Sequence, residues 1–189
     1  MATFTALFDA NVLYPAPLRD LLMWLALENL FRARWSNAIH EEWIGNLLEN
    51  RPDLTREKLE RTRDLMNRAV PDSVVEGYED LIAGLTLPDP DDRRVLAAAV
   101  RAGAAVLVTF NLADFPREAL RPHGIEPCHP DDFIAQLLDE HPGAVCGAIK
   151  KHRDSLKNPP RAVAEYLETL AAQSLPQTVT RLQQFVGVL

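Results

Sequence analysis

Acidic and amide side chains directly follow two apolar runs of this sequence. Asp9 and Asn11 come after the run at residues 3–8, and Asn111 and Asp114 come after a later run that is rich in valine. If both runs are strands of one parallel sheet, their carboxyl ends meet at one edge, where open α/β folds place their functional crevices. Several carboxylates without a neighbouring Lys or Arg repel one another, and a divalent cation relieves that repulsion. These residue types therefore indicate a site for a hard cation.

A third acidic group begins a predicted helix. Asp89 is a favourable N-cap, and Pro90 is a favourable first helical residue. Asp92 shares a face with the apolar residues of this helix, whereas Asp91 lies toward the polar side, so we expect Asp92 to point inward. Acids in a first helical turn or at a strand end, Asp9 included, also occur without any ligand, because the helix dipole and turn formation favour them. Both interpretations stay open for each acid taken alone.

The elements that position these side chains alternate between strands and helices. The expected strands are at residues 3–8, 104–109 and 125–128, and the expected helices cover 18–25, 36–47, 55–69 and 90–102. In the helix at 55–69, the side chains expected to face inward are Leu59, Leu65, Met66 and Ala69. Strands that alternate with helices are typical of a parallel sheet covered on both faces, so the sequence predicts an α/β fold.

The pattern changes near residue 131. From Asp131 onward it is helical throughout, with one apolar stripe formed by Val145, Ile149, His152 and Leu156. We therefore predict two domains, an α/β body at residues 1–130 and a C-terminal helical extension at residues 131–189.

Composition limits the classes of protein to which this chain can belong. Its 189 residues are 47% hydrophobic and 25% charged, as in a soluble globular protein, and its net charge is −7. This acidic balance ordinarily argues against a nucleic-acid partner, but residues 143–163 hold five basic side chains against one acid. No apolar run reaches the roughly 20 residues that a membrane helix needs. The first residues lack the features of a signal peptide, so a cytoplasmic location with no membrane partner is expected.

Four motifs, taken in order along the chain, resemble those of PIN-domain nucleases. They are Phe8-Asp9-Ala10-Asn11-Val12-Leu13, Trp35-Ser36 followed by Glu41-Glu42, Asp89-Pro90-Asp91-Asp92-Arg93-Arg94-Val95-Leu96-Ala97-Ala98-Ala99, and Val108-Thr109-Phe110-Asn111-Leu112-Ala113-Asp114-Phe115. This resemblance covers residues 3–130 and implies a three-layer α/β/α fold around a parallel sheet. Residues 130–133, 141–142 and 157–160 also resemble the helical extension of a subgroup of VapC-type toxins from bacterial toxin–antitoxin pairs.

The resemblance also implies a chemistry, that of an endoribonuclease that uses Mg²⁺ or Mn²⁺ to cleave phosphodiester bonds. The acids that would hold the metal are Asp9, Glu42, Asp92 and Asp114, and the residues that would orient them or the phosphate are Asn11, Thr109 and Asn111. The offset from Ser36 selects Glu42, although the helical pattern by itself leaves Glu41 open. The candidate RNA-binding residues are Arg19, Arg93, Arg94, Lys150, Lys151 and Arg153.

Several functions are compatible with this sequence. A toxin of a type II pair would have RNA as its substrate and a cognate antitoxin as its partner, and family analogy predicts a homodimer. The alternatives are a housekeeping RNA-processing nuclease and an acidic interaction domain without catalysis. A phosphoryl-transfer domain with Asp9 as nucleophile is a further rival, but it would require a second Asp where Asn11 stands.

Overall fold

Five parallel strands form one sheet in the computed structural model, which describes residues 4–189. The strands are β1 (Thr5–Phe8), β2 (Arg32–Ser36), β3 (Val74–Val75), β4 (Val106–Val108) and β5 (Glu126–Cys128), and their order is β3-β2-β1-β4-β5. In the pairing of β1 with its neighbours, Leu7 lies opposite Arg34 on one side and Leu107 on the other. The strand order reverses at β1, so the crevice expected in such folds lies beyond its carboxyl end.

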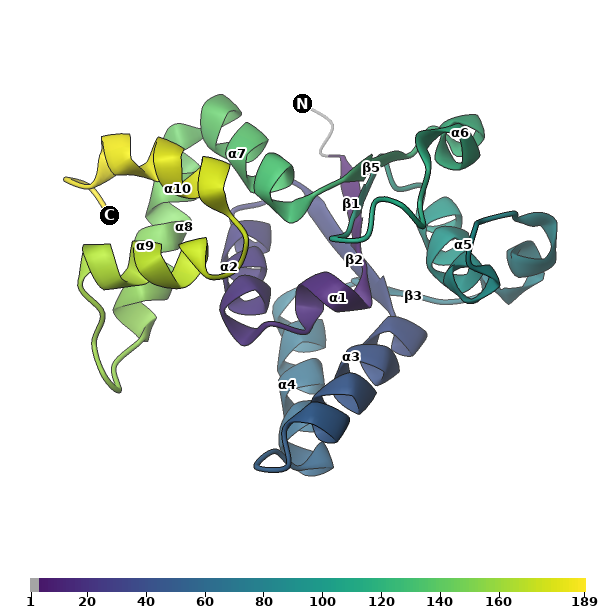
Figure 1. The fold of residues 1–189 in the computed structure, drawn as a ribbon, viewed down its shortest axis with the longest axis horizontal. Coiled ribbons are helices and arrows are strands. Elements are labelled where there is room, and N and C mark those ends of the chain that lie inside the picture. The colour runs from purple at the N-terminus through teal and green to yellow at the C-terminus, as the bar shows by residue number, and fades with distance from the viewer. Residues whose placement is uncertain (1–3) are drawn as a thin grey trace. The chain divides into compact units, whose positions relative to one another are not determined.

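Helices cover both faces of this sheet. Those of the same compact unit are α1 (Ala10–Leu13), α3 (Asn37–Asn50), α4 (Arg56–Ala69), α5 (Arg93–Arg101) and α6 (Arg117–Leu120). Parallel crossovers are almost always right-handed, so connections that run toward β3 and connections that run back toward β5 put their helices on opposite faces. Figure 1 shows α3 and α4 on one side of the strands and α5 and α6 on the other. The predicted three-layer fold is confirmed.

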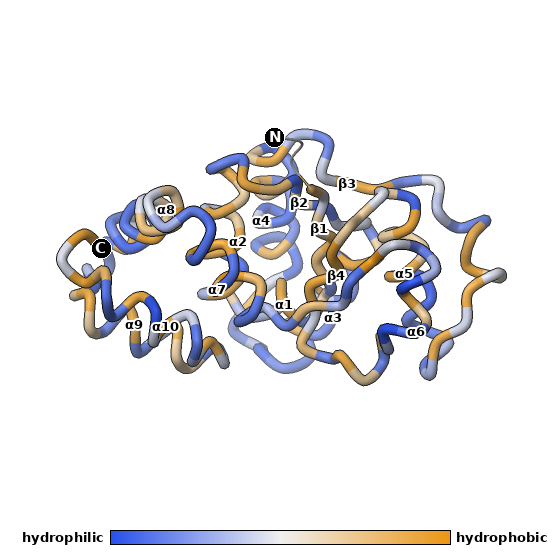
Figure 2. The backbone as a smooth tube through the Cα atoms, turned by 90° about the horizontal axis from the view of Figure 1, so that it is seen from above, coloured by the Kyte–Doolittle hydropathy of each residue, from blue (hydrophilic) through white to orange (hydrophobic). Residues whose placement is uncertain are grey.

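Local sequence explains why the central strands form. β1 and β4 are short apolar segments whose middle residues Leu7 and Leu107 are fully buried, and Figure 2 shows both strands in orange. Strands buried on both faces read as continuous apolar runs, which is why both were visible in the sequence. β2 and β3 were not predicted. β2 contains Arg32 and Arg34, and β3 has two residues, so neither gives such a run.

Helix starts follow the expected capping chemistry. Ser36 caps α3 by accepting a hydrogen bond from Ile39 N at 3.2 Å, as the sequence predicted. Asp89 also caps as expected, but Pro90–Asp92 forms a 3₁₀ turn and α5 begins only at Arg93. In α4, the prediction was wrong for Leu65, which is 51% exposed, and for Ala69, whereas Leu59 and Met66 are buried.

A second compact unit contains the C-terminal helices. It consists of Pro15–Leu30 and Pro130–Leu189, whereas the sheet unit contains Met1–Tyr14 and Phe31–His129. Its helices are α2 (Ala16–Leu27), α7 (Pro130–Glu140), α8 (Pro142–Ser155), α9 (Val163–Ala171) and α10 (Pro176–Leu182). The predicted stripe of α8 is largely buried, with Val145, Ile149 and His152 at 3% exposure or less. None of the helices within residues 4–189 has the length and apolar character needed to cross a bilayer.

Candidate metal centre

Asp9 lies at the carboxyl end of the central strand. It follows β1 directly, and its backbone N donates to Val108 O of β4 at 3.0 Å. Asp9 is 5% exposed. Its φ of −73° and ψ of 158° make it the N-cap of α1. The strand that ends at Asp9 therefore places its carboxylate between the ends of β1 and β4.

Neighbouring polar groups hold this carboxylate in place. Asp9 Oδ2 accepts from Thr109 Oγ1 at 2.7 Å and from Asn11 Nδ2 at 2.8 Å, while its Oδ1 accepts from Ala10 N at 2.7 Å. Asn11 in turn accepts at Oδ1 from Phe110 N at 3.1 Å. Burial raises the pKa of Asp9, and these hydrogen bonds offset part of the rise. Thr109 and Asn11 therefore orient Asp9 by direct contact.

Asp92 faces the other predicted acids. Burial, and then the charges of Asp9, Asp114, Asp89 and Glu42, raise its pKa to about 6. Asp91, by contrast, is exposed. The sequence analysis expected Asp92 to point inward because it shares a face with the apolar residues of its helix. In the structure Asp92, and not Asp91, lies toward Asp9.

The structure also distinguishes between the two glutamates of α3. Glu42 is half-buried, and its pKa is raised first by burial and then by the charge of Asp9. Glu41 is exposed and pairs with Arg56 at 3.1 Å and with Arg63 at 3.6 Å, both on α4. Glu42 therefore lies toward Asp9, and Glu41 serves the contact between two helices.

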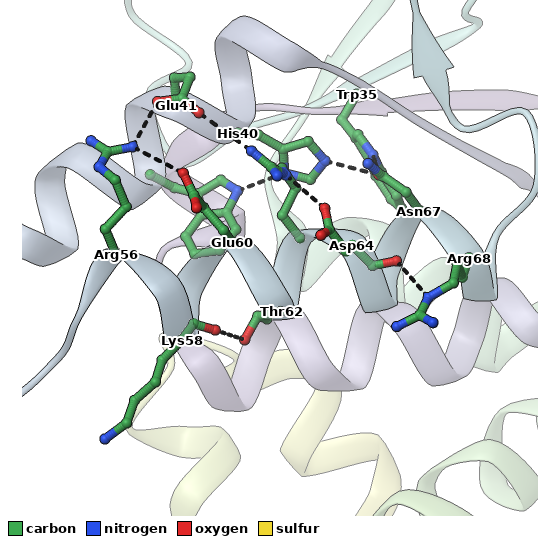
Figure 3. A network of polar contacts seen from close by, with 12 residues as sticks. Trp35, His40, Glu41, Arg56, Lys58, Glu60, Thr62, Asp64, Asn67 and Arg68 are labelled. Carbon is green, nitrogen blue, oxygen red and sulfur yellow. Dashed lines mark hydrogen bonds and ion pairs between the residues drawn. The ribbon is translucent and has the colours of Figure 1, made fainter.

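A buried network fixes the helix that carries Glu42 (Figure 3). Trp43 Nε1 donates to His40 Nδ1 at 3.0 Å, so His40 carries its proton on Nε2, which lies 3.0 Å from Asn67 Oδ1. The same Asn67 oxygen accepts from Trp35 Nε1 at 2.7 Å. This network ties the end of β2 and helix α3 to helix α4. Sequence reasoning did not find it, because its partners are up to 32 residues apart.

We call Asp9, Glu42, Asp92 and Asp114 the acid cluster. The contacts of Asp114, and those of the neighbouring Arg94, complete its description. Asp114 Oδ2 accepts from Asn111 Nδ2, and Asn111 N donates to Thr109 Oγ1 at 3.0 Å. Arg94 Nη2 lies 3.3 Å from Glu42 Oε2, and its positive charge also lowers the pKa of Asp9. The sequence did not indicate which cation compensates the charge of these acids. In the structure, Arg94 does so.

The donor set of the acid cluster fits a hard divalent cation. It offers carboxylate oxygens alone, the ligands that Mg²⁺ and Mn²⁺ prefer. The mutual repulsion recorded in the raised pKa of Asp92 is the electrostatic condition that a cation relieves. Within residues 4–189, however, no three His, Cys, Asp or Glu side chains lie close enough to hold an ion as they stand. Two members of the cluster have other partners, since Glu42 pairs with Arg94 and Asp114 accepts from Asn111.

The candidate RNA-binding residues have different environments. Arg19 is 6% exposed beside Asp20, so it offers little surface to the RNA that the sequence analysis assigned to it. Arg153 donates to Leu189 O and Asp154, and Lys151 pairs with Glu28 at 2.7 Å, so neither is a free cation. Arg93 donates to Pro90 O at 2.9 Å, while Lys150 is exposed. Local sequence gave no sign of these partners.

A parallel sheet covered by helices, with acids near the carboxyl end of its central strand, defines a class of α/β proteins. Comparison with known families makes the class specific. The PIN domain model matches residues 5–113, and a model described as the VapC50 C-terminal domain matches residues 130–184. This chain belongs to the PIN domain family.

One curated relative extends the comparison. A protein of Mycobacterium tuberculosis (strain ATCC 25618 / H37Rv) named "Putative ribonuclease VapC50" is 41% identical to this chain over 108 residues. The aligned part is 57% of this chain and 63% of that protein, so the match spans less than two thirds of the relative's length. No solved structure matches the chain. The resemblance to a VapC-type PIN protein with a C-terminal extension is confirmed.

Proposed function

We propose that this chain is a divalent-metal-dependent endoribonuclease and the toxin of a type II toxin–antitoxin pair. The observation that carries the proposal is the gathering of Asp9, Glu42, Asp92 and Asp114 near the carboxyl end of β1, where their charges act on one another. Membership of the PIN family and similarity to a protein named as a VapC50 ribonuclease support the activity. The match to the VapC50 C-terminal domain supports the assignment to the toxin subgroup.

The proposed mechanism assigns a task to each polar residue. Asp9, Glu42, Asp92 and Asp114 would hold Mg²⁺ or Mn²⁺, which when bound lowers the pKa of water and neutralises charge on the scissile phosphate. Thr109 and Asn11 hold the carboxylate of Asp9 in one orientation through their hydrogen bonds to Oδ2, and in that orientation it would bind the cation. Asn111 does the same for Asp114. Exposed cations such as Lys150 and the partly exposed Arg93 would bind RNA phosphates.

Cleavage of RNA by the purified chain tests this proposal with two matched pairs of variants. Asp92→Asn and Glu42→Gln should lose at least roughly 100-fold in Mg²⁺-dependent cleavage, because each removes a charged ligand. Their neighbours Asp91→Asn and Glu41→Gln should stay within about twofold, since these side chains face solvent or α4. EDTA should abolish cleavage by the unmodified chain. Cleavage that persists in EDTA, or in Asp92→Asn, would contradict the assignment.

The toxin role needs a separate test. Expression of the chain in a bacterial host should arrest growth, and co-expression of the small protein encoded beside its gene should relieve the arrest. The Asp92→Asn variant should not arrest growth. If the active chain cleaves RNA without arresting growth, the housekeeping RNA-processing alternative is favoured instead. If the chain neither cleaves RNA nor arrests growth, it is an acidic interaction domain.

A further inference from the structure

A cavity of about 550 Å³ lies within the second compact unit, and none of its lining residues belongs to the acid cluster. Its walls come from the start of α2, the end of α8, the segment at residues 156–161, and α9. A volume of this size is within the range of about 300–1,000 Å³ that small-molecule sites occupy. The proposed function assigns no role to this cavity.

A buried imidazole forms part of the cavity wall. His152 is 3% exposed, and its Nδ1 lies 2.8 Å from the hydroxyl of Tyr166, which is also buried and also lines the cavity. Burial lowers the pKa of His152 and raises that of Tyr166, so both side chains are neutral near pH 7. Among the described residues, no hydrogen-bond partner exists for His152 Nε2. Although the residue is buried, Nε2 itself is not fully enclosed, so a ligand in the cavity could reach it and bond to it.

Charged side chains complete the cavity wall. Lys157 and Arg161 are exposed and form no ion pair within residues 4–189. Asp20 also lines the cavity and offers a carboxylate to N–H donors. The rest of the wall is mostly apolar, with residues such as Leu156, Pro159 and Leu170, and it also carries the polar side chains of Ser155, Asn158 and Thr169. The cavity therefore combines two cations, a carboxylate, an imidazole and a largely apolar surface.

We propose that this cavity binds one nucleotide, with its phosphate at Lys157 and Arg161 and its base between Asp20 and His152. A phosphate group matches the two cations that have no partner. A base brings a flat apolar ring together with N–H donors for Asp20 and ring or carbonyl acceptors for His152. An acidic peptide would use the cations but offer no donor-bearing ring to Asp20, and an apolar ligand would leave both cations unused.

The nucleotide can come from two sources, free mononucleotides or a residue of the RNA substrate. The second source rests on the proposed function, and the first does not. Both are tested with the whole chain of residues 1–189 in EDTA, where the proposed function predicts that RNA stays uncleaved.

The first arm titrates the chain with GMP, AMP, CMP and UMP, with inorganic phosphate as a reference, and measures affinity by calorimetry and His152 ring ¹⁵N shifts by NMR. At least one mononucleotide should bind at least roughly tenfold more tightly than phosphate. Lys157→Gln and Arg161→Gln should each weaken that binding at least roughly fivefold, because each removes a charge-assisted contact. Asp20→Asn should weaken binding of the nucleotide and leave the affinity for inorganic phosphate unchanged.

Arg181→Gln is the matched control. Arg181 belongs to the same unit and carries the same charge, but it pairs with Asp139 at 3.0 Å and does not line the cavity. Its loss should change nucleotide affinity by less than about twofold. Lys157, Arg161 and Arg181 make no buried contact, so circular dichroism should show all three variants folded. Binding that is equal for phosphate and nucleotides, or equal in Arg161→Gln and Arg181→Gln, would overturn the proposal.

The second arm adds a short single-stranded RNA to the nucleotide complex. Displacement of the mononucleotide identifies RNA as the source, and retention of the mononucleotide identifies a free nucleotide as the ligand. A chain that cleaves RNA but binds no mononucleotide would overturn this inference and leave the proposed function intact. A chain that binds the nucleotide but cleaves no RNA would overturn the proposed function and leave this inference intact.

Discussion

Burial and then the charges of four other acids raise the pKa of Asp92 to about 6. The ordinary value is 3.8, so the folded chain holds this proton more tightly than the unfolded chain does. The stabilising protonated form is fully present below about pH 4 and is lost as the pH rises through about 6. Ionised Asp92 therefore destabilises the metal-free fold at neutral pH.

Removing this charge should stabilise the metal-free chain. In urea denaturation with EDTA at pH 7.5, we expect Asp92→Asn to raise the free energy of unfolding by about 1 kcal/mol, because solvent screens a partly exposed carboxylate. At pH 4 the gain should vanish, since Asp92 is protonated there. Asp91→Asn is the control and should stay within about 0.5 kcal/mol at both pH values. An Asp92→Asn variant less stable than the unmodified chain at pH 7.5 would show that the acids do not repel.

In the proposed metal site, Arg94 would compete with the ion for Glu42, because its guanidinium already pairs with that carboxylate. We expect Arg94→Gln to bind Mn²⁺ roughly three- to tenfold more tightly in calorimetry, since a competing charge is gone. The same variant without metal should melt slightly lower. Arg101→Gln, which breaks an ion pair with Asp80 near the other end of α5, is the control for metal affinity. Weaker Mn²⁺ binding by Arg94→Gln would show that Arg94 supports the metal instead.

Single acids were predictable where a local rule governs them. Asp9 follows an apolar strand, and Asp92 follows from helix geometry once the helix start is recognised. The choice of Glu42 came from the motif offset, and the ion pair of Glu41 with α4 explains it physically. The pairing of Arg94 with Glu42 spans 52 residues and depends on how α5 meets α3, which no local pattern encodes.

At the scale of elements, Asn67 joins β2, α3 and α4 through one oxygen that accepts from both Trp35 and His40. Asn67→Ala leaves two buried N–H groups without an acceptor and should cost about 2–3 kcal/mol in urea denaturation at pH 7. Asn46→Ala, at an exposed position of α3, is the matched control and should cost less than about 0.5 kcal/mol. Equal losses in the two variants would mean that the network contributes nothing to stability.

Protonation of His40 should make the stability of this hydrogen-bond network depend on pH. Burial lowers its pKa from 6.5 to about 4, so the unfolded chain binds its proton more tightly than the folded chain does. Stability should therefore fall as the pH drops from about 6.5 toward 4, by up to about 3 kcal/mol from this residue. His40→Gln should flatten the pH dependence of the urea midpoint between pH 6.5 and 5, whereas His123→Gln, at an exposed position, should leave it unchanged. An unchanged slope in His40→Gln would refute the assignment.

Elements were predictable to the extent that burial is uniform along them. β1 and β4 are covered on both faces and appear as apolar runs, whereas β2 alternates arginine with buried residues and was missed. Leu65 shows the opposite error, because an apolar residue on a helix indicates burial only on average. The start of α5 was displaced by one 3₁₀ turn, a difference that capping residues do not specify.

At the scale of the whole molecule, the chain leaves and re-enters the sheet unit. It crosses between the two units after Tyr14, after Leu30 and after His129. The sequence correctly predicted a helix at residues 18–25, and its leucines are buried, but the pattern could not say which elements would cover them. The structure places α2 with α8 and α9, so a boundary drawn by residue number alone, at 130, omits this inserted helix.

Asp131 tests how independently the second unit opens. Its buried carboxylate accepts from Thr178 N at 2.8 Å and Gln177 N at 2.9 Å, and so caps the start of α10 from α7. Asp131→Ala should cost about 2 kcal/mol, and hydrogen exchange should accelerate in α7 and α10 while amides of β1 and β4 stay unchanged. Asp132→Ala, at an exposed position, is the control. Equal acceleration in the sheet would show that both units unfold together.

The central place of β1 has a consequence for how the chain is made. β1 leaves the ribosome before either of its neighbours, and the strand that closes its second edge, Val106–Val108, follows much later. Until then the nascent chain carries an apolar strand with an open edge, which is the kind of segment that chaperones bind and that associates with other copies. Translation must also pass Asp114 before the four acids can meet, so a fragment that stops earlier lacks one acid of the proposed metal site.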